Sequence, residues 1–169
     1  LGVQQCREMG NQRGVGLALW ILGTLSLTTA QIDRADSLLQ EGLSIFQEID
    51  GAAEVGWVFV MLSDSARQRG QLTLAREFLH KALGMASGVL GFVTVLLGLA
   101  IYVNILGDEG QEERAVEVGA ILEKYPFTRV SPGCRLLYAE RLAEVNAALA
   151  PAIVSEAEAR GRAWRDLQK

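Results

Sequence analysis

QLTLAREFLHKAL, the stretch from Gln71 to Leu83, has two relatives placed forty residues before and after it. These are QIDRADSLLQEGL, Gln31 to Leu43, and QEERAVEVGAILE, Gln111 to Glu123. Each stretch has an alanine four residues after its first glutamine and an apolar position about one turn later, which is helix spacing. A fixed recurrence of this kind predicts a helical repeat. The alanines, Ala35, Ala75 and Ala115, fit a point where two helix backbones approach closely.

The composition predicts a folded chain. Of the 169 residues half are hydrophobic, 21% are charged and only three are proline, which is unlike a disordered segment. The repeat favours a stack of small units that share one continuous core. The net charge of −4 provides no basic surface for nucleic acid, so we expect no direct contact with DNA or RNA.

The two cysteines, Cys6 and Cys134, are far apart and have no CxxC or Cys/His spacing. We therefore expect neither a disulfide framework nor a zinc site, and interpret both as reduced apolar fillers in a cytoplasmic protein. The chain begins without Met and without a signal-peptide pattern. In the forty-residue register Gly2 falls on Gly42, so we expect the chain to be a piece of a longer protein.

The register divides the chain into one repeat domain, 1–169. Residues 1–10 are the remnant of a preceding repeat, 11–50, 51–88 and 89–126 are three helical hairpins, and 131–169 forms C-terminal capping helices. The expected helices are Val15 to Thr29 with Asp33 to Glu48, Ala53 to Arg69 with Leu72 to Ala86, and Val89 to Leu106 with Glu112 to Lys124. A break between Pro126 and Pro132 is followed by a helix from Gly133 to Leu149 and a last one from Pro151 to Leu167.

An uncharged stretch from Ala82 to Gly107 is long enough to cross a membrane. In the repeat register, however, its second part is the first helix of the third hairpin, and a helix packed on both sides in a stack is apolar all round. Gly14 to Ile32 is uncharged at the corresponding place in the first hairpin. We therefore expect burial in a core and no membrane contact.

These columns resemble the tetratricopeptide repeat. Leu22-Gly23 with Ala35, and Leu62-Ser63 with Ala75, match its spacing, whereas the third unit keeps Ala115 and has Tyr102-Val103 in place of Leu-Gly. The resemblance implies an all-α fold, a right-handed alpha-alpha superhelix of antiparallel hairpins. The usual closing proline is absent from the first two units, and we expect the six residues beyond the usual repeat length to form longer turns.

Two features narrow the resemblance. The forty-residue period with LLQEGLSIFQEID, and the tail ERAVEVGAILEKYPF followed by ERLAEVNAALAPAIVSEAEARGRAW, look like the C-terminal repeats of large bacterial signal-transduction ATPases and transcription regulators of the MalT and LuxR type. This implies a non-enzymatic protein-interaction or sensor module of a larger regulator. The same repeats also follow kinase, cyclase and NTPase modules, so the resemblance does not decide which kind of domain precedes them.

In that repeat the first helix of each unit lines a concave face, which we expect to bind a protein, a peptide or another domain of the same polypeptide. The corresponding residues are Leu17, Trp20, Thr24, Leu27, Trp57, Val60, Asp64, Arg67, Leu97, Ala100 and Asn104. Tryptophans are frequent binding anchors, and two of them make a docking helix or peptide the sharpest hypothesis. The same tryptophans also fit a core position or a contact with another copy of the chain.

We find no pattern of catalytic residues. The single histidine, His80, lies among the alternating charges of REFLHKAL, no GxxxxGK[ST] phosphate loop is present, and the acidic clusters lack calcium-ligand spacing. We therefore expect no enzymatic activity, no cofactor and no metal. Self-association through an exposed repeat edge is the alternative function, and an enzyme domain is the least favoured one.

Overall fold

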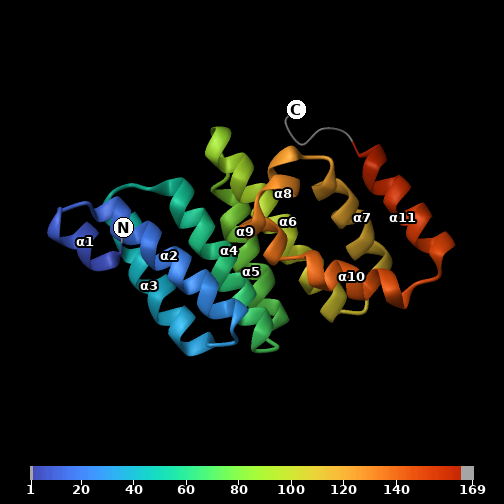
Figure 1. Ribbon diagram of the computed structural model, residues 1–169, viewed down its shortest axis with the longest axis horizontal. Helices are drawn as coiled ribbons and strands as arrows, with labels where there is room; N and C mark the ends of the chain where they lie inside the picture. Colours follow the sequence, from blue (N-terminus) through green and yellow to red (C-terminus); the bar gives the residue numbers. More distant parts are fainter. Residues whose placement is uncertain (1, 165–169) are drawn as a thin grey trace. The chain divides into compact units, whose positions relative to one another are not determined.

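The chain is an all-α fold in which consecutive helices pack antiparallel. The computed structural model describes residues 2–164, except the side chain at position 130. The helices of this part, drawn in Figure 1, are α1 Val3–Glu8, α2 Gln12–Thr28, α3 Ile32–Glu48, α4 Ala52–Gln68, α5 Leu72–Gly84, α6 Gly88–Asp108, α7 Glu112–Glu123, α8 Pro126–Val130, α9 Pro132–Leu136, α10 Ala139–Ala148 and α11 Pro151–Ala163. These bounds confirm the six helices expected from Val15 to Lys124 to within three residues at each end.

The chain forms two compact units, Leu1–Thr94 and Val95–Lys169, and α6 contributes residues to both. In the first unit α2 packs on α3, α3 on α4, and α4 on α5. In the second unit α10 and α11 pack on α7. The three hairpins and the cap were assigned from the forty-residue spacing of the sequence. The boundary between the two compact units, after Thr94, falls inside the third of these hairpins, 89–126.

The same turn joins the helices at five places. At Gly70, which has φ +75°, the chain leaves the end of α4. The Gly70 N–H donates to the Arg67 carbonyl at 2.8 Å and the Gln71 N–H to the Ala66 carbonyl at 2.9 Å, which is the Schellman pattern. Turns with the same two hydrogen bonds and a left-handed residue lie at Gly10, Ala30, Asp50 and Gly110.

The expectation of longer turns was wrong. Helices α2, α3 and α4 each have 17 residues, and only three residues separate one from the next. A helix and its turn therefore occupy twenty residues, and a hairpin occupies forty. The additional residues lengthen the helices because the compact turn leaves no room for them.

The expected helix from Gly133 to Leu149 is divided in the structure. α9 ends at Leu136 and α10 begins at Ala139. The Asn104 side-chain amide donates to the Leu137 carbonyl at 2.6 Å, and the Tyr138 hydroxyl donates to Glu123 Oε1 at 2.9 Å. These bonds explain the break, because they hold the residues between α9 and α10 against α6 and α7. Of the last expected helix, the residues beyond 164 lie outside the described part of the chain.

Candidate functional site

The structure places the expected concave-face residues in two environments, partly exposed and buried. Leu17, Trp20, Thr24 and Trp57 are partly exposed, and Arg67 keeps 15% of its side chain accessible. Leu27, Val60, Asp64, Leu97, Ala100 and Asn104 are buried. Those on α2 and α4 belong to the unit Leu1–Thr94, and those on α6 to Val95–Lys169. The accessible part of the expected site is therefore a small face on α2 and α4, which we call the tryptophan face: Leu17, Trp20, Thr24 and Trp57.

The two tryptophans lie against each other. Their ring centroids are 5.7 Å apart with the ring planes tilted by 44°, a separation typical of a favourable aromatic pair. Trp20 Nε1 donates to the main-chain oxygen of Trp57 at 3.4 Å, and Thr24 Oγ1 donates to the Trp20 carbonyl at 2.9 Å. The pair thus joins the first helices of two successive hairpins while keeping part of both rings accessible.

Trp57 differs from Trp20 in the hydrogen bonding of its indole nitrogen. Trp57 Nε1 is buried and has no hydrogen-bond partner among the described residues. An indole N–H is a donor only, and an unpaired buried donor costs about 1–3 kcal/mol.

The polar residues expected beside the tryptophans are engaged within the fold. Asp64 accepts from Arg67 Nε at 2.7 Å and from Gln68 Nε2 at 2.9 Å. Asn104 is bonded to the Leu137 carbonyl. Both side chains therefore have structural partners, and what α2 and α4 present is largely apolar.

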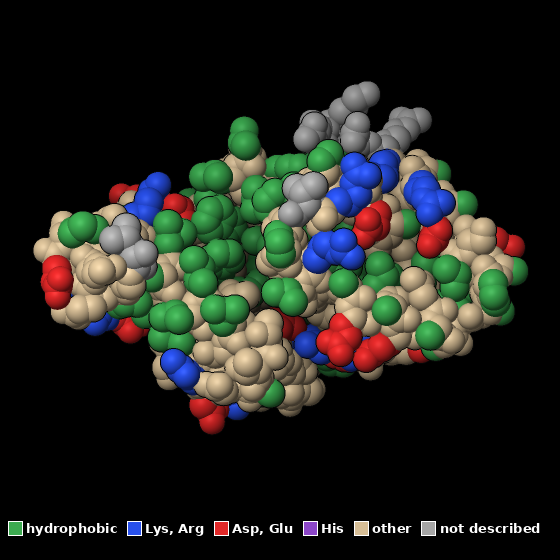
Figure 2. All heavy atoms as spheres, viewed as in Figure 1, with side chains coloured by type: hydrophobic (Ala, Val, Ile, Leu, Met, Phe, Trp, Pro, Cys, Tyr) green, Lys and Arg blue, Asp and Glu red, His purple; other side chains and the backbone are tan. Residues whose placement is uncertain are grey.

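An exposed apolar group on α2 was absent from the sequence prediction. Ile21, Leu22 and Leu25 are 48%, 37% and 51% exposed, and Figure 2 shows hydrophobic side chains gathered over the region of α2 and α4. The repeat register alone would have predicted burial here, because the corresponding positions of the next repeat, Met61, Leu62 and Ser65, are buried.

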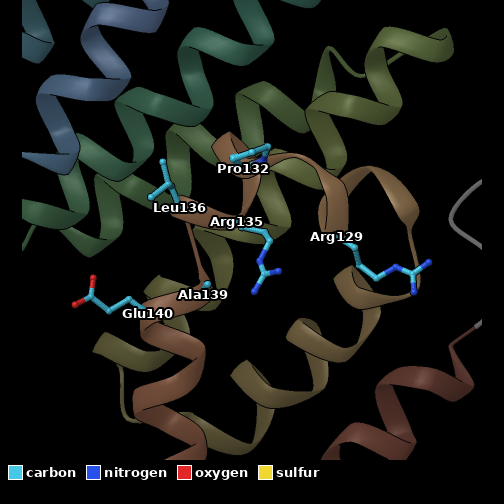
Figure 3. A pocket seen from close by; sticks show the side chains of 6 residues that line it. All are labelled: Arg129, Pro132, Arg135, Leu136, Ala139 and Glu140. Atoms are coloured by element: carbon cyan, nitrogen blue, oxygen red, sulfur yellow. The ribbon is translucent and has the colours of Figure 1, made fainter.

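A depression of about 610 Å³ lies in the second unit, at the α8, α9 and α10 segments. Its lining residues are Arg129, Pro132, Arg135, Leu136, Ala139 and Glu140. Figure 3 shows the Arg129 guanidinium and the Glu140 carboxylate pointing in opposite directions, with Arg135 between them. The charged groups do not converge on one point, as they would in a site built around a single anion.

The reactive side chains differ in how accessible they are. Cys6 and Cys134 are buried free thiols, and burial raises the pKa of Cys134 to about 11, which keeps it protonated at neutral pH. Burial and the hydrogen bond to Glu123 raise the pKa of Tyr138 well above its usual value. His80 is exposed on α5. Within residues 2–164 no group of three His, Cys, Asp or Glu side chains could hold a metal ion.

Helix α6 is long and apolar enough to cross a membrane by length and composition alone. In the structure 61% of its most apolar window is buried inside the protein, and Leu96, Ile101 and Ile105 are completely inaccessible. A core helix of a folded domain has this composition as well.

Comparisons with protein-family models, with curated proteins and with solved structures found no match to this chain.

Proposed function

We propose that this chain is a non-enzymatic interaction module with the tetratricopeptide-like, right-handed solenoid arrangement, and that it binds a peptide or helix through the tryptophan face. In this proposal it serves a larger cytoplasmic bacterial regulator, a transcription activator or a signalling ATPase. Antiparallel hairpins forty residues apart support the architecture. The bacterial regulator and the cytoplasmic location rest on the resemblance of the sequence.

The observation that carries the binding proposal is the partly accessible pair Trp20 and Trp57. Large aromatic side chains contribute most of the free energy at protein interfaces. These two rings are held by their mutual contact and by the Trp20 hydrogen bond, so little side-chain entropy is lost on binding.

A selection from a displayed random-peptide library tests the proposal. Peptides selected on the intact chain are measured against Trp20→Ala with Trp57→Ala, and we expect a loss of at least about 2 kcal/mol, roughly 30-fold in Kd. Trp164→Ala is the matched control, because Trp164 lies at the end of α11 and is 54% exposed.

Circular dichroism of each variant establishes that the helices are retained. Peptides that bind the folded double variant as tightly as the unaltered chain, or a selection that yields no binder, would remove the tryptophan face as a binding site.

A further inference from the structure

The depression at α8, α9 and α10 combines apolar and positively charged surface. It belongs to the unit Val95–Lys169, whereas the tryptophan face belongs to Leu1–Thr94. Its volume of about 610 Å³ is in the range of ligand-binding sites in proteins. The apolar lining comes from Pro132, Leu136 and Ala139, and Leu136 is 66% exposed. An uncovered apolar surface therefore lies beside two arginines, Arg129 and Arg135.

The backbone that carries these side chains is held by buried residues. Thr128, which is inaccessible to solvent, donates from its hydroxyl to the Tyr125 carbonyl at 2.7 Å. Cys134 of α9 is 2% exposed. The hydrogen bond from Asn104 to the Leu137 carbonyl, 2.6 Å, holds the break between α9 and α10. The exposed lining residues thus stand on an ordered backbone, and a ligand binds without the cost of ordering a loop.

The two arginines are available to a ligand. Within the described part of the chain neither the Arg129 nor the Arg135 guanidinium forms a hydrogen bond or an ion pair. In this chain of net charge −4 several other arginines are paired with carboxylates: Arg7, Arg13, Arg69, Arg141, Arg160 and Arg162. The depression therefore presents uncompensated positive charge on a protein that is acidic as a whole.

The arrangement of these groups favours an extended ligand. Figure 3 shows Arg135 in the middle of the depression, with Arg129 on one side of it and Leu136 on the other. A single phosphate would have to meet both guanidinium groups at one point, whereas a chain with separated carboxylates meets them in turn. A small-molecule site buries most of its ligand, but here both arginines, Leu136 and Glu140 are exposed.

We propose that this depression binds an acidic peptide segment of a partner protein. Carboxylates of the segment pair with Arg129 and Arg135, whose guanidinium groups can donate two parallel hydrogen bonds to one carboxylate. A large apolar side chain of the segment packs on Leu136 and Pro132. Glu140 lies on the Leu136 side of Arg135 and repels acid there, so the acidic run lies on one side of the apolar residue.

A counter-selected peptide library identifies such segments. Random displayed peptides are selected on the unaltered chain in the presence of excess soluble variant with Arg129→Glu and Arg135→Glu. The variant removes peptides that do not need the two arginines. We expect the surviving peptides to be enriched in aspartate and glutamate and to carry a leucine, isoleucine or phenylalanine beside the acidic run.

The affinity of a surviving peptide is then measured by fluorescence anisotropy. Arg129→Gln with Arg135→Gln should weaken binding at least about tenfold, and Leu136→Ser should weaken it through the lost apolar contact. The matched control is the same change at Arg34 and Arg114, two exposed arginines that each donate to a nearby glutamine. This control should leave the affinity unchanged.

Two further measurements separate a charge contact from a loss of structure. Glu140→Gln should strengthen binding, because it removes a repulsion, whereas damage to the fold would weaken it. Raising NaCl from about 50 mM to about 500 mM should weaken binding to the unaltered chain, since salt screens exposed charges. Circular dichroism establishes that each variant retains its helices.

Surviving peptides without an excess of carboxylates, or equally tight binding to the glutamine double variant, would overturn the proposal. So would weaker binding to Glu140→Gln, or full competition by inorganic phosphate, which would assign the arginines to a small anion. A dimer in sedimentation equilibrium that Arg135→Glu dissociates would assign the depression to a second copy instead. Trp20→Ala with Trp57→Ala should leave the peptide affinity unchanged, so this proposal and the function of the tryptophan face can fail independently.

Discussion

Ala35 and Ala75 lie where the two helices of their hairpins approach each other. Ala35, Ala75 and Ala115 are all fully buried. A Cβ atom placed on Gly23 would lie 3.5 Å from the Ala35 carbonyl oxygen, and the Ser63 hydroxyl donates to the Ala75 carbonyl at 2.7 Å. Only a small side chain fits where one backbone is this near to the next helix, so the sequence prediction for this column is confirmed.

Enlarging this contact should destabilise the protein. We expect Ala75→Leu to lower the free energy of unfolding by about 1–3 kcal/mol, because the added methyl groups must displace α4. Urea denaturation measures the change. Ala52→Leu is the control, since Ala52 is exposed at the start of α4 and should change stability by less than about 0.5 kcal/mol. Equal effects of the two substitutions would contradict a close contact at Ala75.

The sequence predicted a concave face of eleven residues, and it did not indicate which of them have structural partners. Periodicity assigns a residue to a side of a helix, and it carries no information on what that side contacts. Asp64 is bonded within its own helix and Asn104 reaches Leu137, thirty-three positions later in the chain. The bond from Asn104 to the Leu137 carbonyl lies at the break between α9 and α10. Helix propensity did not predict this break, because the bond joins residues far apart in the sequence.

At the scale of elements, the turns determine the period. Five of them place a left-handed residue at the helix end, and in two cases this residue is Ala30 or Asp50, both with φ +54°. At the other three the residue is Gly10, Gly70 or Gly110, and glycine adopts this conformation at no steric cost. The sequence could not give the turn length, because the similarity of the Ala30 and Asp50 turns to the glycine turns lies in the backbone.

Glycine-to-alanine substitutions at a left-handed turn and within a helix should change the stability in opposite directions. Gly70→Ala forces a Cβ atom into a left-handed conformation with φ +75°, and we expect it to cost roughly 1 kcal/mol. Gly84→Ala, in α5 and equally free of close neighbours, should stabilise by about 0.5–1 kcal/mol through helix propensity. Thermal denaturation compares the two. A stabilising Gly70→Ala would show that the turn at the end of α4 is not left-handed.

At the scale of the whole molecule, the forty-residue repeat describes Leu1–Thr94 well. There α2 to α5 follow one another as antiparallel helices joined by one kind of turn. In Val95–Lys169 the pattern changes, because α10 and α11 both pack on α7. Arg160 forms ion pairs with Glu113 and Glu117, and a Cβ atom on Gly161 would lie within 2.2 Å of the Glu117 carbonyl oxygen. Contacts of this kind join distant segments, which sequence periodicity does not report.

Solution NMR of the alanine methyl groups tests the hairpin repeat most directly. Nuclear Overhauser effects should connect Ala35 with Gly23 and Ala75 with Ser63, the same pair of positions in two successive hairpins. The absence of either contact, or Ala35 and Ala75 lying in unlike surroundings, would contradict a repeat of antiparallel helices forty residues apart.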